Sequence, residues 1–253
     1  MTNALTRRVL DLLARHAPAQ RPHWESMLTH ALDTEPAVFA RPAFSDHYRT
    51  LAANADWFAD SLVANACLEG YGAQQILLFA QRLPKPQHAQ LARRHALDES
   101  RHATVFILAL DLVFPGLLAS QDDSVRAQVR AMQPFLRDET PFSQQPDLLT
   151  PTQAIADIIQ IHITEIRALV LQDLVREAFL RHAPQAHAAR LLRISDRLIA
   201  DEGRHIAYCA DIIEEAASSS ADASGQLHEE MANHMRNFND LTNDELERQA
   251  IEL

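Results

Sequence analysis

A short motif of acidic and basic residues occurs twice in this chain, as Asp-Glu-Ser-Arg-His at 98–102 and as Asp-Glu-Gly-Arg-His at 201–205. The two copies differ only at their third position, and both lie in segments rich in residues that favour helix. Residues i and i+3 share one face of a helix, so each copy can offer a carboxylate and an imidazole to the same metal ion. The two pairs are Glu99 with His102 and Glu202 with His205.

A further glutamate lies in an apolar helical stretch before each copy, Glu69 before the first and Glu165 before the second. Four carboxylates gathered in an apolar interior would repel one another and lose their hydration at a large cost. Two divalent cations carry the charge that balances them. The sequence therefore predicts a site for two metal ions, and mixed carboxylate and imidazole ligands favour iron or manganese over a structural zinc.

The composition predicts an all-α fold. The chain of 253 residues has 5 glycines, while Ala, Leu, Arg, Gln and Glu are frequent. Prolines divide it into segments with apolar residues at helical spacing. Four long helices are expected to form a four-helix bundle, with the segment at 122–138 in the crossover between its two halves. The expected helices cover about 2–16, 22–33, 45–82, 87–114, 122–138, 151–181 and 185–217.

Three regions are expected along the chain. Residues 1–217 would form the bundle with an N-terminal helical extension. Residues 218–226 are rich in Ser and Ala and would form a flexible linker. Residues 227–253 would form an amphipathic helix that either docks on the bundle or pairs with a second copy in a homodimer.

The six candidate ligands read Glu, Glu-x-x-His, Glu, Glu-x-x-His in chain order, and this order resembles the ferritin-like di-iron carboxylate superfamily. The resemblance covers roughly residues 45–217, and the DExRH form is similar to that of its oxygen-activating members. It implies a ferritin-like four-helix bundle with additional helices and two iron ions, or a manganese–iron pair, as cofactor. The ligands that it implies are Glu69, Glu99, His102, Glu165, Glu202 and His205.

The resemblance also gives the aspartate of each motif a supporting role. Asp98 and Asp201 would accept a hydrogen bond from a ligand histidine and fix its orientation. The alternative for each is an ion pair with a nearby arginine. For Arg101 and Arg204 a surface ion pair is the favoured interpretation.

Two further histidines are candidates for an extra ligand or a proton donor. Arylamine N-oxygenases have an additional ligand histidine before their second Glu-x-x-His, but this chain has Leu198 at that position. His95 has the same spacing in the first motif, and His162 lies one helical turn before Glu165. The alternative is that either histidine only borders the polar cluster or contacts solvent.

The resemblance implies an oxidoreductase, an oxidase or monooxygenase that activates dioxygen. Its substrate would be a small, largely apolar or aromatic organic molecule, oxidised by hydroxylation, N-oxygenation, desaturation or C–C cleavage. Electrons would come from an external reductase or ferredoxin. Residues one or two turns from the ligands would line the pocket, and these are Leu62, Ala66, Ala73, Ala96, Ala103, Phe106, Ile158, Leu169 and Leu198.

Net charge and hydropathy limit which other functions and locations are expected for the protein. A formal net charge of −11 disfavours nucleic-acid binding, which needs a surplus of Lys and Arg. The sequence has no membrane-spanning segment or signal peptide, so a cytoplasmic protein is expected. Two alternatives remain open. One is a ferroxidase that handles iron, and the other is a helical interaction protein that binds no metal.

Overall fold

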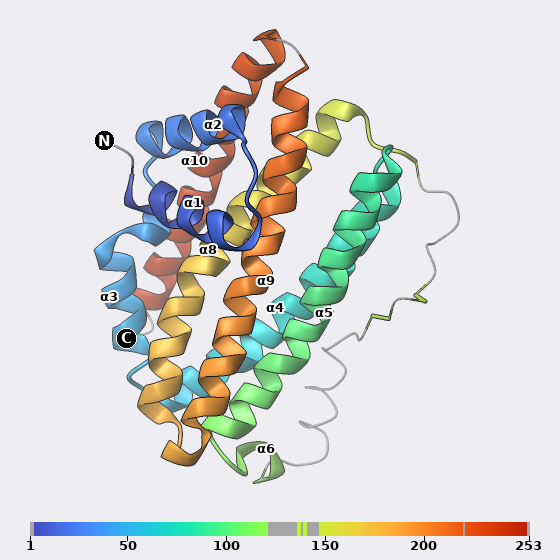
Figure 1. Cartoon of the computed structure of the whole chain (residues 1–253). Coiled ribbons are helices and arrows are strands. Elements are labelled where there is room, and N and C mark those ends of the chain that lie inside the picture. Colours follow the sequence, from blue (N-terminus) through green and yellow to red (C-terminus); the bar gives the residue numbers. More distant parts are fainter. Residues whose placement is uncertain (1–2, 121–135, 138, 141–146, 220, 252–253) are drawn as a thin grey trace. The chain divides into compact units, whose positions relative to one another are not determined.

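A computed structural model describes residues 3–120, 136–137, 139–140, 147–219 and 221–251. Over these residues the regular structure is helical and contains no strand, which confirms the predicted all-α class. The helix expected at 122–138 lies almost wholly outside the described residues. Figure 1 shows the order of the helices along the chain.

The chain divides into two compact units. Unit 1 consists of Met1–His47, Pro151–Leu171 and Ile199–Leu253, and unit 2 consists of Tyr48–Thr150 and Gln172–Leu198. Two long helices, α8 (Pro151–His182) and α9 (Gln185–Ala217), contribute residues to both units. Each unit is described by itself below.

Unit 2 is built on two antiparallel helices, α4 (Ala55–Arg82) and α5 (Pro86–Val113), which lie side by side in Figure 1. The end of α8 (Pro151–His182) and the beginning of α9 (Gln185–Ala217) also belong to it. Proline at the first position of α5 and α8 starts each helix, because proline has no amide hydrogen and its φ suits a helix. The short helix α6 covers Leu117–Ser120.

Aromatic side chains close one end of unit 2. Phe58 on α4 packs edge-on against Phe114 and Phe179, and its ring stacks on that of His182. His182 Nε2 lies 2.7 Å from the carbonyl oxygen of Ala52. These contacts bring the start of α4, the end of α5 and the end of α8 to one level.

Unit 1 contains the N-terminal helices α1 (Ala4–His16) and α2 (Pro22–Thr34), the 3-10 turn η1 (Val38–Ala40), and α10 (Ala221–Ile251). The remaining parts are the start of α3 (Pro42–Leu51), the first part of α8 and the second part of α9. Its fully buried side chains are large and apolar, and burial of each typically stabilises a fold by about 1.5–3 kcal/mol. They include Trp24, Met27, Leu28, Phe39, Met231 and Met235.

Helix α10 docks on α2 and η1 within unit 1. The side-chain oxygen of Asn239 accepts a hydrogen bond of 2.8 Å from the amide of Val38, and Phe238 packs edge-on against Phe39. The helix begins at Ala221, whereas the sequence predicted a linker up to 226 and a helix from 227. Because α9 ends at Ala217, only a short connection separates the two helices.

The prediction of one continuous helix at 45–82 is wrong at one point. The segment forms two helices, α3 (Pro42–Leu51) and α4, with a break before Ala55. The side chain of Asn54 accepts hydrogen bonds from the amides of Asp56 and Trp57 and so caps the start of α4. A capping asparagine favours the start of a new helix over continuation of the preceding one.

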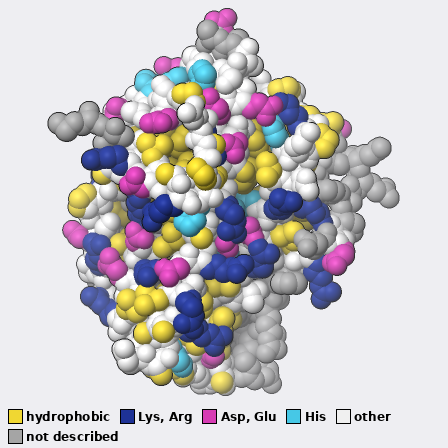
Figure 2. All heavy atoms as spheres, viewed as in Figure 1, with side chains coloured by type: hydrophobic (Ala, Val, Ile, Leu, Met, Phe, Trp, Pro, Cys, Tyr) yellow, Lys and Arg dark blue, Asp and Glu magenta, His cyan; other side chains and the backbone are white. Residues whose placement is uncertain are grey.

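Charged side chains of both signs are interspersed over the face shown in Figure 2. Of the helices in the described part of the chain, none combines the length and the apolar character that crossing a membrane requires.

Candidate metal centre

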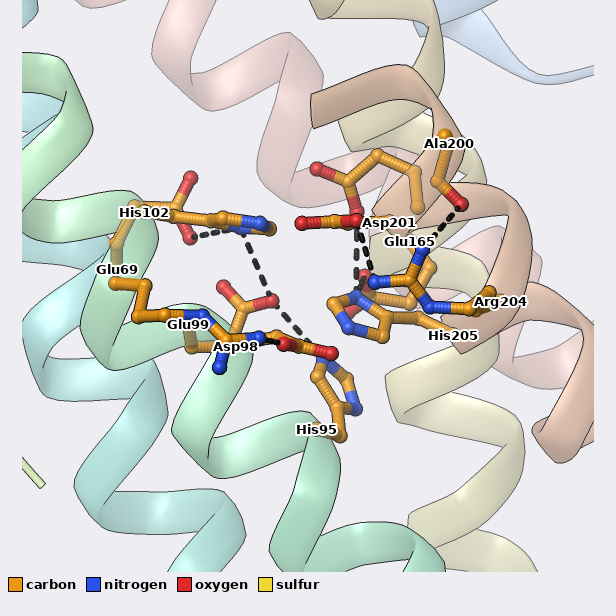
Figure 3. A network of polar contacts seen from close by, with 12 residues as sticks. Glu69, His95, Asp98, Glu99, His102, Glu165, Ala200, Asp201, Arg204 and His205 are labelled. Atoms are coloured by element: carbon orange, nitrogen blue, oxygen red, sulfur yellow. Dashed lines mark hydrogen bonds and ion pairs between the residues drawn. The ribbon is translucent and has the colours of Figure 1, made fainter. Parts of the chain in front are cut away.

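The first half-site lies in unit 2, where three of the predicted ligands meet. Glu69 comes from α4, and Glu99 and His102 come from α5. His102 Nδ1 lies 3.5 Å from Glu99 Oε1 and 3.9 Å from Glu69 Oε2. One donor atom from each of the three residues can be chosen so that all lie within 4.8 Å of one another. Figure 3 shows the imidazole and the two carboxylates turned toward each other.

Local sequence explains why these helices can approach so closely. Alanine occupies buried positions one turn from the ligands, at Ala66 and Ala73 on α4 and at Ala96 and Ala103 on α5. All four are fully buried, with 0% of each residue exposed. Small side chains let two helix backbones pack closely, so that the carboxylate of one helix reaches the imidazole of the other.

His95 extends the first half-site by one helical turn. Its Nε2 atom lies 3.2 Å from Glu99 Oε1, and its side chain is fully buried. The structure thus brings this histidine into contact with a predicted ligand.

The Glu99 carboxyl group is ionised more readily than an ordinary glutamate. Burial by itself would raise its pKa, but hydrogen bonding with Glu69 and the contacts of His102 and His95 outweigh burial and hold the pKa well below its usual range. A buried carboxylate that stays ionised is a suitable ligand for a cation. The side chain of Glu69 is the most exposed of the three ligands, at 17%.

The second half-site lies in unit 1 and has the same composition. Glu165 comes from α8, and Glu202 and His205 come from α9. His205 Nδ1 lies 3.2 Å from Glu165 Oε2 and 3.6 Å from Glu202 Oε2. All three residues are buried. Both Glu-x-x-His pairs therefore meet the isolated glutamate that the sequence assigned to them.

The distances fit a bound cation. Iron-type ions lie about 2.0–2.2 Å from carboxylate oxygens and imidazole nitrogens, so two neighbouring ligand atoms on one ion are about 3–3.5 Å apart. The nitrogen–oxygen distances of both half-sites, 3.2 to 3.9 Å, are close to that separation. A buried His/Glu cluster of this kind could hold a metal ion.

The aspartates of both motifs form ion pairs with the arginine three residues later. Asp98 pairs with Arg101, and Asp201 pairs with Arg204. Both aspartates are buried, whereas about half of each arginine side chain is exposed. The predicted pairing of the arginines is found. The hydrogen bonds that the aspartates would accept from ligand histidines remain a prediction.

His162 is held by a residue that the sequence analysis did not consider. Trp24 on α2 donates a hydrogen bond of 2.9 Å from its indole Nε1 to His162 Nε2. Burial lowers the pKa of His162 to about 4, although the charge of Glu165 opposes that shift. Since Nε2 accepts a hydrogen bond, this imidazole is neutral and its Nε2 is occupied by Trp24.

The N-terminal helices fix the second half-site from outside. The amide of Trp24 donates to Glu214 Oε2 on α9 at 2.8 Å, and the guanidinium of Arg21 donates to Asp211 at 2.6 Å. Leu12 on α1 lies against Gly203, where an added Cβ would meet it at 3.2 Å. A tryptophan within an amphipathic N-terminal segment was the only sequence signal for these contacts, and it does not reveal its partner.

The chain matches no family model, no curated protein and no solved structure in comparisons with known proteins.

Proposed function

We propose that this protein is a ferritin-like di-iron oxidase or oxygenase, which activates dioxygen to oxidise a small organic substrate. The observation that carries the proposal is the repeated half-site, in which an imidazole Nδ1 faces two carboxylates in a buried setting. One such cluster can arise from packing alone. Two copies of one ligand set on the Glu-x-x-His pattern favour a shared metal-binding role.

Charge supports two divalent ions as the cofactor. The two half-sites together contribute four glutamates, and two divalent ions would balance four carboxylates. We propose that one half-site holds each ion, with iron favoured because the ligands are oxygen and nitrogen atoms rather than thiolates. The ions would supply electrons for the reduction of dioxygen. The ligands are Glu69, Glu99, His102, Glu165, Glu202 and His205.

The chain's own residues would hold the ions and exclude water from them. Ala66, Ala73 and Ala103 around the first half-site are buried and apolar, and Ile158 and Leu198 are buried as well. An apolar lining strengthens electrostatic interactions and limits side reactions with water. Electrons would come from a separate reductase or ferredoxin.

Metal content tests the proposal directly. The protein is reconstituted anaerobically with Fe(II), desalted, and its iron per chain is measured for wild type, Glu99→Gln and Glu202→Gln. Asp111→Ala is the matched control, because it removes an exposed carboxylate from α5. We expect about two ions per chain in wild type and in the control. Each glutamine variant should retain less.

Three results would contradict the proposal. Wild-type protein that retains no iron would exclude a metal centre and favour the helical interaction protein. Glutamine variants that retain as much iron as wild type would place the iron elsewhere. Repeated aerobic oxidation of added Fe(II), many times beyond the bound iron and without an organic substrate, would instead identify a ferroxidase.

A further inference from the structure

Two polar side chains are buried in the apolar core of unit 2 and are not among the proposed metal ligands. These are Gln172 on α8, which is 4% exposed, and Ser195 on α9, which is 1% exposed. Neither the side-chain oxygen of Gln172 nor the hydroxyl of Ser195 has a hydrogen-bond partner among the residues that the structure describes. An unsatisfied buried polar group commonly destabilises a fold by about 1–3 kcal/mol. Two such groups in one core therefore call for a physical reason.

Ser195 differs from three other hydroxyl residues in the described helices. Ser61, Thr164 and Thr242 each donate to a carbonyl oxygen about one turn earlier in their own helix, at distances of 2.8, 3.0 and 2.8 Å. This local bond is the usual way for a helical Ser or Thr to satisfy its hydroxyl. Ser195 does not form it, so its hydroxyl stays available to another partner.

Gln172 and Ser195 lie at the same level of the α8–α9 hairpin. Gln172 precedes the end of α8 at His182 by 10 residues, and Ser195 follows the start of α9 at Gln185 by 10 residues (182 − 172 and 195 − 185). At 1.5 Å per residue, each is about 15 Å from the turn. An ion pair between Arg176 and Asp196 joins the two helices within one turn of both residues.

Both residues lie on helix faces that point into the core. Ser195 is flanked by Leu191 and Leu198 at helical spacing, and Val175 lies one turn after Gln172. All three apolar residues belong to the buried core cluster of unit 2. The two polar side chains are therefore buried on helix faces that they share with apolar core residues.

Gln172 and Ser195 lie at a level along the helices of unit 2 that is close to the first half-site. Phe58 on α4 contacts Phe179 and His182 on α8, which sets the relative level of these two helices. Counted from that contact at 1.5 Å per residue, Gln172 lies near the level of Ala66, about one turn from Glu69.

We propose that Gln172 and Ser195 form a polar subsite, which recognises a small neutral molecule with an apolar body and one O–H or N–H group. The carbonyl oxygen of Gln172 would accept a hydrogen bond from the ligand, and the hydroxyl of Ser195 would donate or accept a second one. Buried Leu62, Ala66 and Phe106 offer apolar contacts for its body. The inference rests on the proposed function for the reaction of the bound molecule, since that subsite would place the ligand near the metal ion of the first half-site, which lies in the same unit.

Phenol and toluene are suitable probes because they have nearly the same shape, while only phenol carries an O–H group. Their binding to the purified protein is measured by calorimetry and by ligand-detected NMR, and the iron content of the same preparation is recorded. We expect phenol to bind about tenfold more tightly than toluene, in keeping with one to two buried hydrogen bonds.

The Gln172→Met/Ser195→Ala double variant should lose this preference and bind both probes alike, because methionine keeps the volume of glutamine but offers no carbonyl oxygen. Its unfolding temperature without ligand should rise, since two unsatisfied polar groups are removed. Thr6→Val is the matched control, because the buried Thr6 hydroxyl on α1 also has no hydrogen-bond partner among the described residues. It should keep the preference for phenol.

Three results would overturn the inference: equal binding of the two probes by wild type, no binding of either probe, or a preference that persists in the double variant. If the preference for phenol persists in the double variant, an ordered water is the remaining partner for Gln172 and Ser195. Ser195→Ala alone provides the test if the double variant does not fold. If the protein binds phenol but retains no iron, the proposed function fails while this inference stands.

Discussion

The indole nitrogen of Trp24 donates a hydrogen bond of 2.9 Å to Nε2 of His162, and both side chains are fully buried. The two rings meet edge-on, with centroids 5.7 Å apart. This contact fixes the neutral form of a histidine that lies one turn before Glu165. It connects the N-terminal extension directly to the second half-site within unit 1.

Replacing this tryptophan should weaken the fold. Trp24→Phe keeps an aromatic ring but leaves His162 Nε2 buried without its donor, so we expect the free energy of unfolding to fall by about 1–3 kcal/mol. Urea unfolding measures the change. Trp57→Phe is the control, since Trp57 is only partly buried and packs edge-on against Tyr48. An equal loss in both variants would mean that the hydrogen bond contributes little.

The stability of the protein should depend on pH through His162. Its pKa in the folded protein is about 4, against an ordinary value of 6.5. Between these values the unfolded chain binds a proton that the folded protein does not bind. The free energy of unfolding therefore falls as pH drops from about 6.5 toward about 4, and His162 adds no pH dependence above that range.

Chelator-treated wild type and His162→Gln provide the measurement, by urea unfolding at several pH values. Glutamine keeps an acceptor for Trp24 but does not titrate, so the variant should lose stability less steeply over this range. Parallel pH profiles for the two proteins would show that His162 is not the group responsible.

Glycine in the helices should respond to alanine substitution in two different ways. Gly72→Ala should stabilise the protein by about 1 kcal/mol, because alanine favours helix and an added Cβ meets no atom within 4 Å. Gly203→Ala should stabilise the protein less than Gly72→Ala, or should destabilise it. The added Cβ would lie 3.2 Å from the buried Leu12 side chain. Thermal unfolding compares them. A larger gain at Gly203 than at Gly72 would show that Leu12 moves away freely.

Loss of the cap at the start of α4 should destabilise unit 2. Asn54→Ala removes the acceptor for the amides of Asp56 and Trp57, at a cost of about 1 kcal/mol. Asn54→Asp should restore most of this stability, because aspartate caps a helix equally well. Denaturant unfolding of both variants tests the role of the side chain, and equal stability of the two would rule out capping as the cause.

Much of the fold and of each half-site could be predicted because the information is local. The spacing of Glu99 and His102 on one helix face follows from helical geometry, and the same holds for Glu202 and His205. Prolines marked the starts of α5 and α8. The helix break before Ala55 was missed because the apolar periodicity continues through it, and only the capping side chain of Asn54 marks the new start.

The sequence by itself determined the helical class, most helix boundaries, and the pairing of each Glu-x-x-His with a preceding glutamate. Tertiary structure decided which distant residues meet, such as Trp24 with His162, and that α10 packs on α2. It also decided that Gln172 and Ser195 are buried without a described partner. Helix formation depends on neighbours a few residues away, whereas contacts between helices depend on how complete surfaces pack, and no short pattern specifies that packing.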